Sequence, residues 1–173
     1  MRLRIVKYGD PVLETPCEPV PEGEFGTPEL RSLVSDMFET MYAASGVGLA
    51  APQVGISRRL TVIDCTGGED KSAKVVLVNP TILSGEGEQV GEEGCLSIPG
   101  FRENVARPST VRVRAFTVDG EEQELESEEL LARVICHECD HLDGVLFLEH
   151  ISRFKREWIK RKIRNLKKRG EWD

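Results

Sequence analysis

The chain contains 173 residues, of which 39% are hydrophobic, 31% charged and 6% aromatic. This length suits one globular unit with a buried core, and the composition excludes low-complexity disorder and fibrous repeats. The sequence has no apolar run of about 18 residues, and its start lacks an apolar stretch of signal-peptide length. We therefore expect one domain over residues 1–173 that stays in the cytoplasm and makes no contact with a membrane.

Charge is distributed unevenly along the chain. Residues 152–173 contain ten of the 23 lysines and arginines but only three acids, so this tail carries +7 and the remainder carries −14. Apolar residues recur in the tail at helical spacing, which predicts a helix with one docked face and one solvated cationic face. They are Ile151, Phe154, Trp158, Ile159, Ile163 and Leu166. The cationic face is either a solvated surface or a contact for nucleic acid.

An irregular arm precedes the first predicted helix, because the stretch up to Gly26 contains four prolines. Residues 27–29, Thr-Pro-Glu, predict the start of this helix with a capping hydroxyl, a proline at the first helical position and an acid in the first turn. The helix should end near residue 45, where two glycines follow within three residues.

Strand patterns dominate the middle of the chain and predict strands over residues 59–64, 74–79, 111–118 and 121–125. Asp119 and Gly120, between the last two, indicate a hairpin. Ser127 is the predicted N-cap of a helix over about 128–142, and Gly144 is placed to end it. Strands flanked by helices at both ends predict one α+β domain with antiparallel sheet.

The second predicted helix contains an HExxH pattern, His137-Glu138-Cys139-Asp140-His141. Histidines at i and i+4 lie on one helical face and can converge on one metal ion. Glu138 is then close enough to activate a bound water. Burial of two histidines and a glutamate without a metal or partners would be costly, which favours a metal site.

Two cysteines on the same helix form a rival CxxC motif. At about 100° per residue, Cys136 and Cys139 point about 150° away from the two histidines, so one ion cannot take both pairs. A redox CxxC normally lies at a helix start, and this one lies two turns inside the helix. We expect both thiols to be small core residues. The five cysteines are an odd number in a chain that needs no disulfides, so we expect them reduced.

A catalytic metal with two histidines needs a third protein ligand and an open position. Cys95 is one candidate, because it lies in the turn-rich segment 91–100 where a thiolate can project and backbone N–H groups can bind an oxyanion. Glu149 and Glu157 are the alternatives, as in zinc peptidases. The residues alone leave this choice open.

Three segments together resemble the motifs of bacterial-type peptide deformylases. Residues 46–53 are Gly-Val-Gly-Leu-Ala-Ala-Pro-Gln, residues 93–97 are Glu-Gly-Cys-Leu-Ser, and residues 137–141 are the HExxH pattern. Their order and approximate spacing match the family, and the similarity extends over nearly the whole chain. The resemblance implies an α+β fold with antiparallel sheets around a central metal-binding HExxH helix, with a C-terminal helix.

The same resemblance implies a metal-dependent hydrolase that removes the formyl group from the N-terminal formyl-methionine of newly made polypeptides and releases formate. Cys95, His137 and His141 would bind one divalent metal, typically ferrous iron, which nickel, cobalt or zinc can replace; ligand type alone does not choose among these metals. Glu138 would accept the proton of the attacking water. The backbone N–H of Leu96 and the side-chain amide of Gln53 would stabilise the oxyanion together with the metal.

Substrate binding is implied by the other two motifs. Val47, Gly48 and Gly94 would pair their backbone with an extended peptide, as an added strand at a sheet edge. Arg102 matches an arginine that the family keeps after the cysteine motif, where either a substrate role or a surface ion pair is plausible. The pocket for the methionine side chain would be formed by Val47, Leu130, Val134 and the ring of His137.

One position departs from the family, because Cys136 stands where glutamine is common. The basic C-terminal helix is associated in some members with docking near the ribosomal exit, so a ribosome contact is a further expectation here. Two other classes remain as alternatives: an HExxH metallopeptidase, and a noncatalytic binding module with a basic tail.

Overall fold

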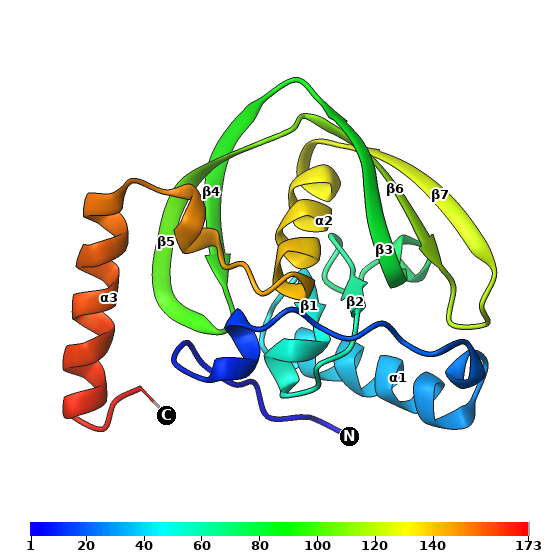
Figure 1. Ribbon diagram of the computed structural model, residues 1–173, viewed down its shortest axis with the longest axis horizontal. Helices are drawn as coiled ribbons and strands as arrows, with labels where there is room; N and C mark the ends of the chain where they lie inside the picture. Colours follow the sequence, from blue (N-terminus) through cyan, green and yellow to red (C-terminus); the bar gives the residue numbers. More distant parts are fainter. Residues whose placement is uncertain (173) are drawn as a thin grey trace.

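The computed structural model describes residues 1–172, and Figure 1 shows how its elements are arranged. Its three α-helices are α1 (Pro28–Ala43), α2 (Glu129–Leu142) and α3 (Arg153–Lys168). Its seven strands are β1 (Gly48–Ala50), β2 (Leu60–Ile63), β3 (Val75–Glu86), β4 (Gln89–Cys95), β5 (Ile98–Arg107), β6 (Thr110–Phe116) and β7 (Glu122–Glu128). Helix α2 lies in the middle, with strands on both sides, while α1 and α3 lie outside (Figure 1).

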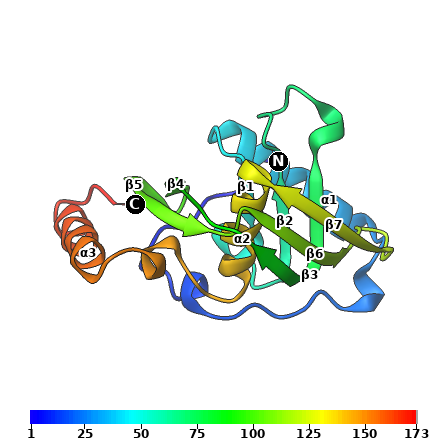
Figure 2. The ribbon, with the colours of Figure 1, turned by 90° about the horizontal axis from the view of Figure 1, so that it is seen from above.

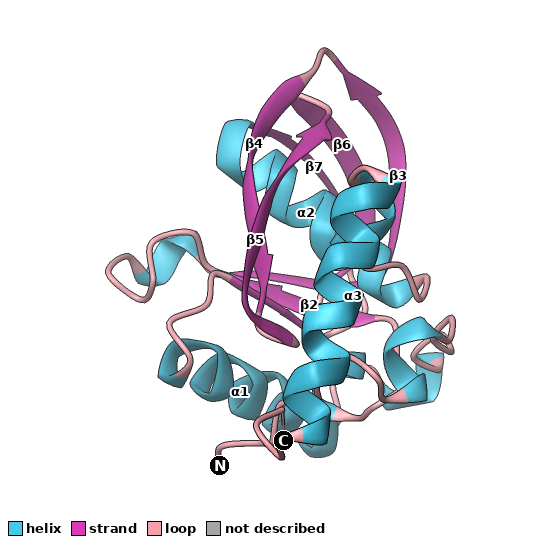
Figure 3. Cartoon of the chain, turned by 90° about the vertical axis from the view of Figure 1, so that its left-hand side faces the viewer, coloured by secondary structure: helices cyan, strands magenta, loops and turns pink. Residues whose placement is uncertain are grey.

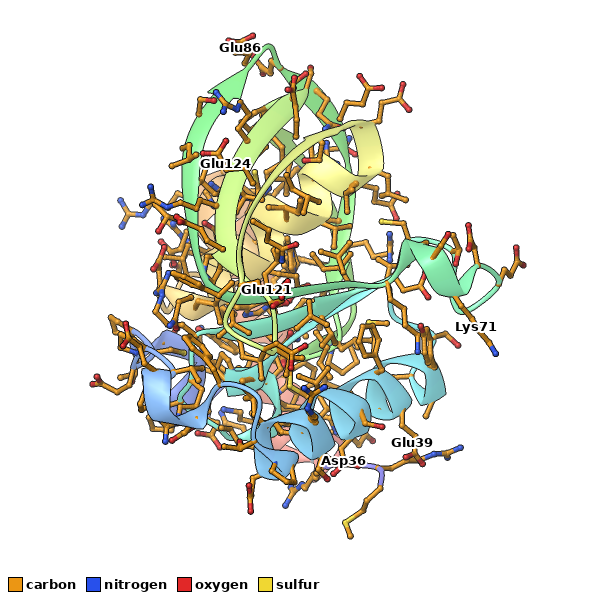
Figure 4. All side chains as sticks on the ribbon, turned by 90° about the vertical axis from the view of Figure 1, so that its right-hand side faces the viewer. Asp36, Glu39, Lys71, Glu86, Glu121 and Glu124 are labelled. Carbon is orange, nitrogen blue, oxygen red and sulfur yellow. The ribbon has the colours of Figure 1, made fainter. Side chains whose placement is uncertain are left out.

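Two antiparallel sheets surround α2, as the sequence predicts. Five strands form one sheet in the order β1-β2-β3-β6-β7, and β4 pairs with β5 in the other. Strand β3 is longer than expected and contains two irregularities, after Val78 and after Ile82. It rises to a tip at Glu86, from which the chain turns into β4 (Figure 4). Strands β1 and β4 each pair on one side only within the described sheets.

The hairpin β4–β5 replaces the irregular segment expected over residues 91–100. Its seven-residue register runs from Gln89 opposite Arg107 to Cys95 opposite Ile98. Strand β4 contains two acids and glutamine beside two glycines, so it has no apolar alternation for a pattern to detect. Backbone pairing and buried polar contacts, rather than an apolar face, hold this strand in place.

The predicted helix caps are right in one case and wrong in another. Thr27 caps α1, because its Oγ1 accepts a hydrogen bond from the Leu30 N–H at 3.3 Å. Ser127 does not cap α2: it belongs to β7, and its hydroxyl donates to the Val111 carbonyl at 3.2 Å. The sheet offers this hydroxyl a buried acceptor, so the strand continues to Glu128 and the helix begins one residue later.

The C-terminal helix forms as expected but docks by fewer residues. Ile159 and Ile163 are 1% exposed and pack in the core cluster around the hairpin β4–β5. Phe154 and Trp158 remain 81% and 45% exposed, so the prediction that they belong to the docked face is wrong. Helix α3 stands apart from the large sheet and lies against the hairpin β4–β5, which leaves only a narrow stripe to bury (Figures 2 and 3).

The N-terminal arm is attached to the rest of the molecule at Met1 and at Tyr8. The Met1 ammonium lies 2.7 Å from Asp36 and 2.7 Å from Glu39, two acids on the outer face of α1 (Figure 4). The Trp172 indole donates to the Tyr8 carbonyl at 2.8 Å, which joins the C-terminal segment to the arm. No helix among residues 1–172 is long and apolar enough to cross a membrane.

A buried carboxylate locks the end of α1 to the end of β2. Asp64 is fully buried and accepts hydrogen bonds from the Tyr42 hydroxyl at 2.5 Å and from the Thr66 N–H at 2.9 Å. Burial opposes ionisation of Asp64, but the hydrogen bonds from Thr66 and Tyr42 outweigh it and lower the pKa of this carboxyl. Burial and the neighbouring carboxylate raise the pKa of Tyr42 to about 12, so it remains a donor.

Replacing the Tyr42 hydroxyl should destabilise the fold. Tyr42→Phe should lower the free energy of unfolding by about 2 kcal/mol, because a hydrogen bond to a buried charge is lost. Urea unfolding at pH 7 measures the change. Tyr8→Phe is the matched control, because no hydrogen bond from the Tyr8 hydroxyl is present among residues 1–172. Equal stability of both variants would contradict the role of Tyr42.

Candidate metal centre

Helix α2 presents two histidines on one buried face. His137 and His141 are one turn apart, and their Nε2 atoms are 3.2 Å from each other. Both rings are buried, and they meet edge to face with centroids 4.9 Å apart. Burial lowers the pKa of His141 well below its ordinary value, so its ring is neutral, as a metal ligand requires.

Cys95, at the end of β4, supplies a third ligand atom. Its Sγ lies 3.4 Å from His141 Nε2, and the ligand atoms of Cys95, His137 and His141 all lie within 4.8 Å of one another. Around one tetrahedral ion at ordinary bond lengths, such atoms are separated by about 3.3 to 3.7 Å. The donor set therefore fits one divalent metal bound by a thiolate and two imidazoles.

The other metal-binding candidates lie elsewhere. Glu149 is outside α2 on the surface and pairs with Arg156 at 3.3 Å, and Glu157 is exposed on α3. Cys136 and Cys139 are buried in the apolar cluster between α2 and the large sheet, as predicted from their helical direction. Burial raises the pKa of both thiols, which keeps them protonated and disfavours metal binding.

Glu138 lies beside the ligand cluster and is 3% exposed. Its Oε2 has no hydrogen-bond partner among residues 1–172, although it is fully buried. Burial raises the pKa of Glu138 to about 7, with the His137 charge opposing this shift. A Cβ atom on Gly48 would lie 2.6 Å from Glu138 Oε1, so only glycine lets β1 approach this carboxyl so closely.

Gln53 points its amide at the same centre. This residue lies in the short 3-10 helix Ala51–Val54, directly after β1, and is 1% exposed. Its Oε1 accepts a hydrogen bond from the Ala50 N–H at 2.9 Å, which assigns the other end of the amide as the NH₂ group. That Nε2 lies 3.5 Å from Cys95 Sγ and 3.3 Å from Ser97 Oγ. A donor is thus held beside the ligand thiol.

A buried carboxylate orients His137 from behind. Glu93 is 5% exposed, and its Oε1 accepts a hydrogen bond from His137 Nδ1 at 2.9 Å. This bond fixes the ring so that Nε2 faces the ligand cluster. Burial alone would raise the pKa of Glu93, but hydrogen bonds from His137 and Arg107 outweigh it and hold this pKa well below its ordinary value.

Two arginines complete the network around Glu93. Arg107 donates to both carboxylate oxygens, at 2.9 and 3.0 Å, and also to Asp140 at 2.7 Å. Arg133 donates to Glu93 Oε2 at 2.6 Å. Arg107 and Arg133 lie outside the three sequence motifs, so the sequence predicts no role for them. A charged residue one turn before His137, on the ligand face of the helix, is the signal in the sequence that could have indicated Arg133.

A cavity of about 620 Å³ opens onto the ligand cluster between β1 and β4. Its lining includes Val47, Leu130, Val134 and His137, the four residues expected to form a side-chain pocket. Gly48, Gly94, Leu96 and Gln53 also border it. Nine of the ten sequence-predicted site residues line this cavity, and the tenth, His141, belongs to the ligand cluster with His137 and Cys95.

Arg102 lies at the mouth of this cavity. Its Nε donates to Glu92 at 2.5 Å, and both side chains are about 60% exposed. A Cβ atom on Gly94 would lie 2.9 Å from Arg102 Nη1, so the arginine covers the backbone of β4 at that glycine. The surface ion pair that is one of the two alternatives is present, and the substrate role stays a prediction.

A thiolate and two helix-borne imidazoles, with a buried carboxyl beside them, define the centre of a metal-dependent hydrolase. A family model described as polypeptide deformylase matches residues 2–157. A peptide deformylase of Acidobacterium capsulatum is 56% identical over 168 residues, which are 97% of each chain. The chain therefore belongs to the polypeptide deformylase family.

Solved structures agree with this assignment. The peptide deformylase of Legionella pneumophila superposes with a TM-score of 0.89 at 40% identity, over 100% of this chain and 99% of that one. The peptide deformylase of Thermus thermophilus superposes with a TM-score of 0.86 at 42% identity, over 95% of each chain. The protein is thus an enzyme that removes the N-formyl group from nascent peptides.

Loss of the thiolate should empty the metal centre. Cys95→Ala should lose stoichiometric divalent metal, because two imidazoles alone remain to bind it. Inductively coupled plasma mass spectrometry on dialysed protein measures the stoichiometry. Cys136→Ala is the control: its thiol lies on the opposite side of α2, so this variant should keep one metal per chain. Full metal content in Cys95→Ala would contradict the assignment of the third ligand.

Proposed function

We propose that Glu138 is the general base and acid of the deformylation, acting beside one ferrous ion held by Cys95, His137 and His141. The observation that carries this proposal is the buried carboxyl of Glu138, whose unpartnered Oε2 lies next to the three-ligand cluster. Its pKa of about 7 suits a group that must both take and return a proton near neutral pH.

The bound metal would supply a Lewis acid that activates water and polarises the formyl carbonyl. Glu138 accepts the proton of the attacking water at its carboxylate and then returns it to the leaving amine, after which formate departs. Gln53 and the backbone N–H of Leu96 donate hydrogen bonds to the developing oxyanion. The bond from Ala50 to Gln53 Oε1 supports this role, because it holds the donor end of the amide toward the centre in advance.

The formylated peptide binds as a strand between the two sheets. Strands β1 and β4 have unpaired edges that border the cavity, so an extended chain can pair with Val47 and Gly48 on one side and Gly94 on the other. The methionine side chain enters the pocket formed by Leu130, Val134 and the ring of His137. Arg102 lies at the mouth and contacts the residues that follow.

Iron is the metal we propose for the enzyme in the cell. One thiolate and two imidazoles suit iron, zinc, nickel and cobalt alike, so the donor set supports a divalent transition metal and the family resemblance supports iron. The thiolate also argues against the metallopeptidase alternative, whose third ligand would be Glu149 or Glu157. Both of these glutamates lie on the surface, outside the cluster.

The base can be tested separately from the metal. Protein purified without oxygen and loaded with ferrous iron should release formate from a formyl-methionyl tripeptide. Glu138→Ala should retain the metal and lose activity by at least about 100-fold, because it removes the proton acceptor. Glu126→Ala, an exposed glutamate on β7, is the control and should match the parent.

The result also separates the two enzyme classes. Parent-like formate release by metal-loaded Glu138→Ala would disprove the role of Glu138. Absence of formate release from the parent, with cleavage of internal bonds in an unformylated peptide, would favour the metallopeptidase.

We further propose that residues 1–173 act as one catalytic domain that works at the ribosome in the bacterial cytoplasm, where nascent chains emerge. The support is the distribution of charge: α3 turns its lysines and arginines outward, while Ile159 and Ile163 attach it to the acidic body. Phosphate groups of ribosomal RNA are the counterpart that such a surface favours.

Charge reversal tests this contact without disturbing the core. Deleting residues 152–173 would also remove buried Ile159, Ile163 and Trp172, so Arg161→Glu, Arg164→Glu and Lys168→Glu together are preferable. This triple variant should lose salt-sensitive cosedimentation with ribosomes while it still deformylates a tripeptide. A variant reversed at exposed Arg112 and Arg114 on β6 should cosediment like the parent. Unchanged cosedimentation of the triple variant would overturn the proposal.

A further inference from the structure

Arg133 is a buried cation on the ligand-bearing face of α2, one turn before His137. The residue is 6% exposed, yet it lines the cavity and lies among groups of the two-stranded sheet β4–β5. A buried guanidinium is costly unless its N–H groups find acceptors. The acceptors that it has therefore show what this residue holds together.

All four acceptors of Arg133 lie on the hairpin β4–β5. Its Nη1 donates to the carbonyls of Gly91 at 3.2 Å and Val105 at 2.9 Å, and its Nη2 donates to the carbonyl of Gln89 at 3.3 Å. The fourth acceptor is Glu93 Oε2 at 2.6 Å. One side chain from the helix thus binds backbone of both strands and a side chain of β4.

The hairpin is shaped to receive this guanidinium. A Cβ atom on Gly91 would lie 3.1 Å from Arg133 Nη2 and 3.3 Å from its Cζ, which is tighter than ordinary packing allows. Glycine at this position therefore gives the guanidinium access to the carbonyls. Arg107, the other arginine on Glu93, belongs to β5 and reaches α2 at a different point, through Asp140 at 2.7 Å.

The two oxygens of Glu93 divide their partners between helix residues. Oε2 accepts from Arg133 at 2.6 Å, and Oε1 accepts from His137 Nδ1 at 2.9 Å. Arg107 donates to both oxygens, at 2.9 and 3.0 Å, so Arg133 and Arg107 together hold the carboxylate with Oε1 facing the imidazole. Cys95 follows Glu93 by two residues on the same strand, so the position of β4 also determines the position of the ligand thiol.

We propose that Arg133 is a positioning residue that clamps β4 against α2 and thereby sets the distance between the Cys95 thiolate and the two histidine ligands. The clamp acts through four hydrogen bonds on the hairpin and through the orientation of Glu93. This inference rests on the metal site described above, and it assigns to Arg133 a function in metal binding beyond the stability of the fold.

Cobalt binding tests the clamp without an activity assay, because a thiolate ligand gives Co²⁺ a charge-transfer absorption band. Arg133→Met keeps the aliphatic stem and removes the guanidinium with its four hydrogen bonds, and Arg133→Lys keeps the charge but not the planar fork. Both should bind Co²⁺ about 10-fold more weakly than the parent and show a weaker or shifted thiolate band. Arg112→Met, which removes an exposed arginine paired with Glu124, should match the parent in both readouts.

The outcomes are distinct. A purely structural role would lower the unfolding temperature of the Arg133 variants but leave the cobalt affinity and spectrum of the folded protein unchanged, and that result would overturn the proposal. If Arg133→Met fails to fold, Arg133→Lys decides by the same two readouts. A parent that binds no Co²⁺ would refute the metal site itself, and the inference with it, whatever the formate assay shows.

Discussion

The structure depends on one buried negative charge, the carboxylate of Glu93. Removing such a charge from water costs several kcal/mol unless nearby groups compensate it. Here the compensation comes from Arg107 on β5 and from Arg133 and His137 on α2. The Glu93 carboxylate therefore has all its hydrogen-bond partners only when the hairpin β4–β5 is packed against α2. The same contacts that stabilise the charge fix the tautomer of His137 and the position of Cys95. Folding of this region and positioning of the metal ligands thus depend on the same buried charge.

The open sides of the two sheets explain how a peptide could reach this centre. An unpaired strand edge exposes backbone donors and acceptors, which proteins usually cover or shorten. In this fold β1 is only three residues long and β4 ends at the ligand thiol, so the two edges meet the cavity near the metal centre. Glycines at 48 and 94 remove the side chains that would otherwise fill the space beside Glu138 and Arg102. At these two positions the groove stays open because no side chain projects from the backbone.

Acidic and basic residues are concentrated in different parts of the molecule. The acidic body contains the buried network and the catalytic centre, whereas the cations of residues 152–173 are concentrated on a helix at the edge of the molecule (Figure 1). Ile159 and Ile163 are the fully buried residues that dock α3, and Leu166 packs partly against the same cluster. Phe154 and Trp158 stay exposed because the helix meets the body along one narrow stripe.

The sequence by itself determined the elements with strong local signals: the capped helix after Thr27, the Asp119-Gly120 hairpin, and the helix on which His137 and His141 share a face. It also predicted a metal site there, since i and i+4 spacing places two imidazoles together in any α-helix. Only the tertiary structure decided the rest. The hairpin β4–β5 lacks an apolar alternation and forms because its backbone pairs and its polar residues find partners across the molecule. Residue chemistry alone left Cys95, Glu149 and Glu157 open as the third ligand; the family resemblance implied Cys95, and the distances in the fold place its thiol beside the two histidines. That Arg133 reaches across to the hairpin depends on distances between residues far apart in the chain, and no local pattern contains them.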